Sequence, residues 1–190
     1  MRKILFLSLS AFLMTASYSP AFAAGGGGTP AQPAQPVKEV KKCKEGEVVK
    51  KVKRLGFWTK KCVPIEQGFL PDGELYEQGR QLAKAGEYEK ALIVLAAIKN
   101  QNDPHVLNYT GYSNRKAGRL EIGITYYRKA LAIDPNFVLA REYLGEGYVA
   151  AGRIDLAKLE LNEIKARAGT GSEEYQDLSR AIATGVVAAD

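Results

Sequence analysis

Between residues 50 and 61 the sequence interleaves cationic and aromatic side chains, a pattern whose chemistry would be polyanion binding. Cations meet phosphate or carboxylate groups, and aromatic faces stack on bases or sugar rings. The candidate patch consists of Lys50, Lys51, Lys53, Arg54, Trp58, Lys60 and Lys61, with Phe57 beside the tryptophan. The alternative is a solvated lysine-rich segment whose Trp58 covers a disulfide or docks on the next helix. We favour this alternative because charge runs are usually solvated faces.

Cys43 and Cys62 flank this patch and are the only cysteines of the chain. An even pair in an exported chain predicts a disulfide, which would stabilise a loop of this size by roughly 3 kcal/mol. Zinc is the rival use of the two thiols. Two cysteines and one remote histidine fall short of four ligands, so we predict no metal site.

The residues between the cysteines predict a β-hairpin. Strands are expected at 47–53 and 57–63, on either side of Leu55-Gly56. Its small core is expected to draw on the apolar residues Val48, Val49, Val52, Leu55, Phe57, Trp58 and Val63.

Residues for catalysis are scarce. His105 is the sole histidine and stands at an expected helix start, where a solvated or capping role is common. The sequence has no G-x-S-x-G, H-E-x-x-H or phosphate-loop motif. We therefore predict a protein that is not an enzyme and needs no cofactor.

The N-terminus predicts export. Arg2 and Lys3 precede an apolar run over 4–14, and Ala21-Phe22-Ala23 has the small-x-small pattern of a cleavage site. The run is shorter than the roughly 20 residues of a membrane-spanning helix, so we expect a signal peptide, 1–23, and no transmembrane segment after cleavage. The mature protein would be periplasmic or secreted.

Composition divides the rest of the chain. Residues 24–36 carry no charge and are rich in Gly, Pro, Ala and Gln, which predicts a disordered linker. Residues 37–62 hold ten basic and three acidic residues, whereas 63–190 hold fifteen basic and eighteen acidic ones. The basic excess therefore belongs to the cysteine-containing module, 37–64, and a connector, 65–71, follows it.

From residue 72 the apolar residues recur with helical period, and one turn signal repeats. Ala85-Gly86, Ala117-Gly118 and Ala151-Gly152 are separated by 32 and 34 residues. This spacing is typical of a helix-turn-helix solenoid, in which each unit buries its apolar face against its neighbours. The predicted units are 72–103, 104–137 and 138–170. A final amphipathic segment, 171–187, is expected to cap the last unit, with Ser172 or Thr170 at its start.

These residues resemble the tetratricopeptide repeat (TPR) family over about half of the chain. The middle unit carries the family's apolar, small and proline positions, with Asn114 where Tyr or Leu is usual. The third unit carries Arg141 at its first apolar position. The resemblance implies an all-α solenoid of three repeats plus a capping helix, behind the small disulfide-stapled hairpin. Its small and turn-forming positions are Gly79, Ala91, Gly111, Gly123, Pro135, Gly145 and Ala157. We expect Gly79 to face Ala91, Gly111 to face Gly123, and Gly145 to face Ala157.

In the resembled family, the first helix of each unit lines a concave groove that holds a peptide. Carried over position by position, the groove residues are Tyr76, Arg80, Lys84, His105, Asn108, Tyr112, Arg115, Lys116, Glu142 and Glu146. Glu142 and Glu146 stand where carboxylate-binding members carry basic or amide side chains, which argues against a carboxylate clamp. The alternative for each position is a solvated helix face.

The resemblance implies a non-catalytic scaffold or adaptor that binds a protein or peptide of the cell envelope. The alternative is an envelope attachment protein whose hairpin binds an anionic polymer, namely peptidoglycan, polysaccharide or a lipid surface. Export disfavours nucleic acid as a partner. The two readings differ in salt dependence, because polyanion binding weakens steeply as ionic strength rises.

Overall fold

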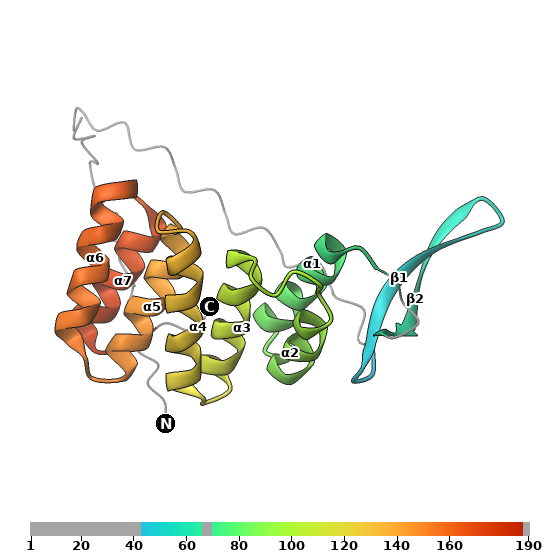
Figure 1. Cartoon of the computed structure of the whole chain (residues 1–190), viewed down its shortest axis with the longest axis horizontal. Helices are drawn as coiled ribbons and strands as arrows, with labels where there is room; N and C mark the ends of the chain where they lie inside the picture. Colours follow the sequence, from blue (N-terminus) through green and yellow to red (C-terminus); the bar gives the residue numbers. More distant parts are fainter. Residues whose placement is uncertain (1–42, 66–69, 188–190) are drawn as a thin grey trace, which may run out of the picture. The chain divides into compact units, whose positions relative to one another are not determined.

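The computed structural model describes residues 43–65 and 70–187. They form a β-hairpin followed by seven helices, and all of these elements belong to the same compact part of the chain (Figure 1). The hairpin strands are β1 (Glu47–Arg54) and β2 (Phe57–Pro64). The helices are α1 (Asp72–Lys84), α2 (Tyr88–Ala96), α3 (Pro104–Lys116), α4 (Leu120–Ile133), α5 (Val138–Ala150), α6 (Ile154–Ala168) and α7 (Glu173–Thr184). The predicted signal peptide, the linker, positions 37–42 and most of the connector lie outside the described residues.

Helices α1 to α6 pack as three antiparallel pairs, and each pair is joined by the same turn. Gly86, Gly118 and Gly152 have φ of 79°, 85° and 71°, a region that glycine enters without steric cost. The residue after each glycine donates its N–H to the carbonyl five residues back, as from Arg119 to Asn114 at 2.9 Å. This is the Schellman ending of an α-helix, so the repeated Ala-Gly signal encodes one defined turn three times.

Small residues at the helix crossings allow the paired helices to approach closely. A Cβ built on Gly79 would lie 2.7 Å from Leu95 of α2, and one built on Gly111 would lie 2.8 Å from Tyr127 of α4. The third crossing differs from the prediction. The atoms nearest a Cβ at Gly145 belong to Leu178 of α7, and not to Ala157. In the third unit, the small residue therefore makes room for the capping helix.

Helix α7 covers the end of the solenoid, as predicted. Leu178 and Ala181 are buried, and Tyr175 and Ile182 pack against the same core. Its start is fixed by Ser172, whose Oγ accepts a hydrogen bond from the Tyr175 N–H at 3.2 Å.

The hairpin covers the other end of the solenoid with its base alone. Val48 is 2% exposed and belongs to the same core as α1 and α2, whereas Leu55, Phe57 and Trp58 are 98%, 77% and 70% exposed. The expectation that these three side chains join a hairpin core is therefore wrong. The hairpin has only two strands, so its far half has no layer to pack against. Trp58 accordingly covers neither the disulfide nor a helix.

Two features hold the hairpin base in place, a disulfide within the hairpin and a side chain of α1. The predicted disulfide joins Cys43 to Cys62 across a Cα–Cα distance of 5.6 Å. Gln78 of α1 accepts from the Val49 N–H at 2.7 Å and donates to the Val49 carbonyl at 2.8 Å. Its amide thereby pairs with the outer edge of β1 as a neighbouring strand would.

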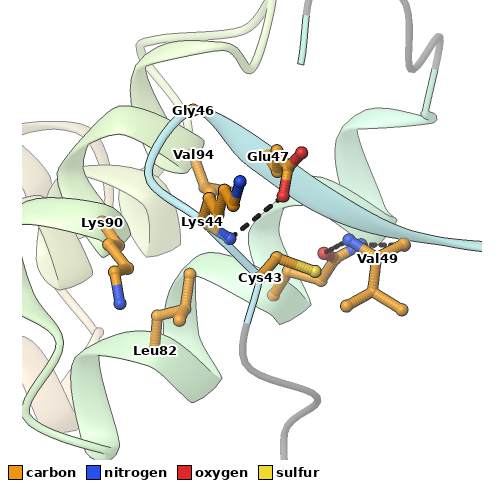
Figure 2. Close-up of a pocket in the computed structure, with 9 residues that line it drawn as sticks. Cys43, Lys44, Gly46, Glu47, Val49, Leu82, Lys90 and Val94 are labelled. Carbon is orange, nitrogen blue, oxygen red and sulfur yellow. Dashed lines mark hydrogen bonds between the residues drawn. The ribbon is translucent and has the colours of Figure 1, made fainter. Parts of the chain in front are cut away.

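A small pocket of about 20 Å³ lies at this junction, lined in part by Lys44, Leu82, Lys90 and Val94 (Figure 2). Figure 2 also shows the hydrogen bond from the Lys44 N–H to the Glu47 carboxylate, 3.0 Å long, which closes the turn before β1. This volume holds about one water molecule, so the pocket is no site for an organic cofactor.

Replacing Gly145 by leucine should destabilise the protein, because the new side chain would collide with the fully buried Leu178. The expected loss is roughly 1–3 kcal/mol in the free energy of unfolding, measured by urea denaturation. Gly73→Leu is the matched control, since Gly73 lies in the first turn of α1 with nothing within 4 Å of its Cβ position. Equal stability of the two variants would contradict the packing of α7 on α5.

Candidate functional site

The predicted groove residues come from α1, α3 and α5, and the structure brings many of them together. We call this surface the α1/α3/α5 face. On α3, His105, Asn108, Tyr112 and Arg115 follow one another at spacings of three and four residues and so share one side of the helix. The flanking helices contribute to the same surface through direct contacts.

A cluster of cations and tyrosines joins the three helices. Lys84 of α1 donates to the Tyr143 hydroxyl of α5 at 2.9 Å, and its Nζ lies 5.0 Å from the ring centre of Tyr112. The rings of Tyr112 and Tyr143 lie 5.2 Å apart. Lys116 adds a second ammonium, 5.6 Å from the Tyr112 ring centre. The aromatic faces thus stabilise positive charge on this surface.

Sequence reasoning missed Tyr143 and Tyr109. Both occupy the same place in consecutive units, 34 residues apart, and both are buried. Tyr109 lies 5.9 Å from Tyr76 and 5.9 Å from Tyr112, ring centre to ring centre. Their shared register was the available signal, because a large polar aromatic repeated at one position of two units suggests a common contact.

Arg115 and Glu146 form a buried ion pair across the second and third units. The Arg115 Nη2 lies 2.7 Å from the Glu146 Oε2, and the two side chains are only 5% and 2% exposed. Arg115 also donates from Nε to the Tyr127 hydroxyl at 3.2 Å. These two predicted groove charges therefore bind each other. Glu142, the other acidic position of the third unit, is buried as well.

The first unit carries a more accessible part of the face. Arg80 donates to the Glu77 carboxylate at 2.7 and 3.0 Å, and its side chain is 37% exposed. This hydrogen bonding raises the pKa of Arg80 and lowers that of Glu77. Burial raises the pKa of Tyr76 to about 12, so its hydroxyl stays protonated. His105 is exposed, with its ring 4.6 Å from that of Phe137 and 6.0 Å from that of Tyr76.

Asn108 is the unusual residue of the face. It is fully buried, yet neither its Oδ1 nor its Nδ2 has a hydrogen-bond partner. A buried amide without partners costs free energy, and native proteins retain few of them. Such a group is suited to bind the N–H and C=O of a peptide backbone, which offers one donor and one acceptor per residue.

The predicted polyanion patch lies on the hairpin and is divided between its two faces. Residues directly opposite each other share a face, and the register pairs Lys50 with Lys61 and Lys51 with Lys60. Lys53 stands opposite Trp58, and Arg54 opposite Phe57. The patch is therefore a ribbon with cations on both sides and aromatics near its tip.

Within residues 43–65 and 70–187, no group of three or more His, Cys, Asp or Glu side chains is arranged to hold a metal ion. No helix of the described ranges is long and apolar enough to cross a membrane.

Comparison with known proteins identifies the fold. No protein-family model and no curated protein matches the sequence. Solved TPR structures match this structure over 60% of the chain. The first TPR of Spaghetti (RPAP3), bound to the HSP90 peptide SRMEEVD, has 16% identity and a TM-score of 0.51 over 94% of its own length.

The Yersinia enterocolitica type III secretion chaperone SycD matches in two structures, each 18% identical to this chain. One, in complex with a peptide of the translocator YopD, has a TM-score of 0.51 with 87% of it covered. The other has a TM-score of 0.52 with 81% of it covered. The fold is therefore a short TPR solenoid with a capping helix, as the sequence resemblance predicted.

Breaking the Arg115–Glu146 pair should show that it belongs to the fold. Glu146→Leu or Arg115→Met alone deprives one buried charge of its ion-pair partner and should cost roughly 3–5 kcal/mol in the free energy of unfolding. The double variant removes both charges and should recover most of that loss, which urea denaturation of all four proteins measures as a coupling energy. Additive losses in the double variant would contradict the pairing.

Proposed function

We propose that this protein is an exported, non-catalytic TPR scaffold that binds an extended segment of another cell-envelope protein on its α1/α3/α5 face. Asn108 carries the proposal. Its unpartnered amide lies in the middle of the face, on the same side of α3 as His105 and Tyr112. Asn108 is 0% exposed, so a bound peptide would reach its amide by displacing the side chains that cover it. The peptide would then supply the missing hydrogen bonds and relieve a cost that the unbound protein carries.

Two of the structurally similar TPR proteins are complexes with peptides, an HSP90 peptide and a YopD peptide. This supports a peptide as the ligand class. The ring faces of Tyr76 and His105 and the guanidinium of Arg80 offer further contacts beside Asn108. Tyrosine and arginine are enriched in such contacts because each combines a large, flat surface with hydrogen bonding.

Export is supported by the N-terminal sequence and by the disulfide. Arg2 and Lys3, the apolar run and the Ala21-Phe22-Ala23 site together form the pattern of a signal peptide. The Cys43–Cys62 bond is of the kind that persists in oxidising compartments such as the periplasm.

Asn108→Leu should separate peptide binding from folding. Removing an unsatisfied buried amide should leave the thermal unfolding temperature unchanged or raised, whereas affinity for a display-selected peptide should fall about tenfold or more. Calorimetric titration of one peptide, selected on the mature protein, measures this affinity. Arg128→Ala, an exposed site on α4, is the control and should bind like the parent. The proposal fails if Asn108→Leu and His105→Ala both keep the parent affinity.

Mass spectrometry of the protein recovered from its native compartment should find a chain that begins at Ala24, with the disulfide intact. Ala23→Asp removes the small residue before the expected cleavage point and should leave residues 1–23 attached. A parent protein that retains Met1 would contradict export by this route.

A further inference from the structure

The hairpin tip concentrates the most exposed large apolar side chains of the described residues. Leu55, Phe57 and Trp58 are 98%, 77% and 70% exposed, and they fall within four consecutive positions. Solitary exposed apolar residues are ordinary, but a cluster at the end of a projecting element marks an interaction site. Capping the solenoid does not explain the cluster, because Val48 and its neighbours at the hairpin base perform that task.

Leu55 is unfavourable at its position both in backbone conformation and in exposure to water. Its φ is 47°, and Gly56 beside it has φ of 85°, so the two residues form a turn with positive φ at both positions. Asparagine or aspartate before glycine is preferred in such turns, and leucine is disfavoured there sterically. Water does not favour an exposed leucine either. Its presence is therefore best explained by an apolar environment that the tip enters.

From Val48 onward, the charged residues of the strands behind the tip are all positive. Residues 48–65 contain six cations and no acidic residue. The register places Lys50 opposite Lys61 and Lys51 opposite Lys60, so two consecutive cross-strand pairs repel each other, one on each face of the ribbon. Like charges directly opposite each other destabilise a strand pair, so an anionic surface beside the ribbon would stabilise it.

The tip also stands well away from the helices. Gln78 holds β1 at Val49, and six further residues lead from there to Leu55. At about 3.3 Å per residue, the tip lies roughly 20 Å along the strand from this attachment. The attachment at Gln78 and the disulfide hold the hairpin base rigidly. The tip can therefore contact a large surface while the helices stay clear of it.

We propose that the hairpin tip binds the surface of an anionic lipid bilayer. Leu55, Phe57 and Trp58 enter the interfacial layer, where aromatic rings are favoured, and the lysines behind them contact lipid phosphates. Charge complementarity selects an anionic surface. The apolar tip selects a bilayer over a soluble anionic polymer, which offers no hydrocarbon to Leu55.

The chain provides its own reporter, because Trp58 is its only tryptophan. The test uses the mature protein from Ala24, which contains every described element and lacks the apolar run at 4–14. Vesicles of phosphatidylcholine and phosphatidylglycerol at three to one should shift the Trp58 emission to shorter wavelength and protect it from iodide. Phosphatidylcholine vesicles should have little effect, and added salt should weaken binding.

Two variants remove binding without harming the fold. Leu55→Asn suits the turn better than leucine and should reduce the vesicle partition coefficient roughly tenfold. The double variant Lys51→Gln/Lys60→Gln removes one repulsive pair and should reduce partitioning by roughly tenfold or more. Leu159→Asn on α6, where the leucine is 59% exposed, is the matched control and should bind like the parent.

An unshifted Trp58 emission with anionic vesicles would overturn the proposal, as would parent-like partitioning of Leu55→Asn. Vesicle binding that soluble polyglutamate abolishes, and that Leu55→Asn leaves unchanged, would assign the cations to a polymer site instead. Asn108→Leu should keep full vesicle binding, so this test succeeds or fails independently of peptide binding on the α1/α3/α5 face.

Discussion

Close approach of paired helices is the constraint on which the rest of the structure depends. Gly79 and Gly111 bring Leu95 and Tyr127 of the partner helices to a distance that no side chain would permit. One side of α1 and of α3 packs closely on α2 and on α4, respectively. The remaining sides of α1 and α3 contact the next unit and form part of the α1/α3/α5 face. In the first two units, one small residue thus sets how closely the paired helices pack.

A solenoid of three units has two open ends, and this chain closes them by different means. At the C-terminal end, α7 continues the helical packing, and Gly145 makes room for Leu178. At the N-terminal end, a β-hairpin replaces a helix, and the Gln78 amide bonds both polar groups of Val49. A strand placed against a helix would otherwise leave those groups unpaired at a buried junction. Only the hairpin base serves this purpose, which leaves the tip to a separate task.

The sequence was sufficient to predict the repeats, because their turn and crossing residues act locally. Ala-Gly at the end of a helix specifies the Schellman turn whatever surrounds it, and the apolar period specifies the packed face. The two departures from the TPR pattern are also explained by local contacts. Asn114 accepts from the Arg119 Nε at 2.7 Å, and Arg141 donates to the Pro135 carbonyl and pairs with Glu160.

The hairpin tip and the charged face were less predictable, for a shared physical reason. Whether Leu55 or Trp58 is buried depends on what lies beside the hairpin, and no property of the segment itself determines that. Likewise, Arg115 and Glu146 are charged residues that would be expected to face solvent in a groove. They are 31 residues apart in the sequence, yet they bind each other. Composition reports what a side chain could bind, whereas only the packing decides whether the protein itself already provides the partner.

That internal pairing limits what the α1/α3/α5 face can recognise. Arg115 is engaged by Glu146, Lys84 by Tyr143, and Arg80 by Glu77, so a ligand carboxylate would have to compete with contacts already made. Displacing such partners costs about as much as the new contact returns. The buried amide of Asn108 has no such competitor. Recognition on this face should therefore depend more on the peptide backbone and on aromatic contacts than on ligand charge.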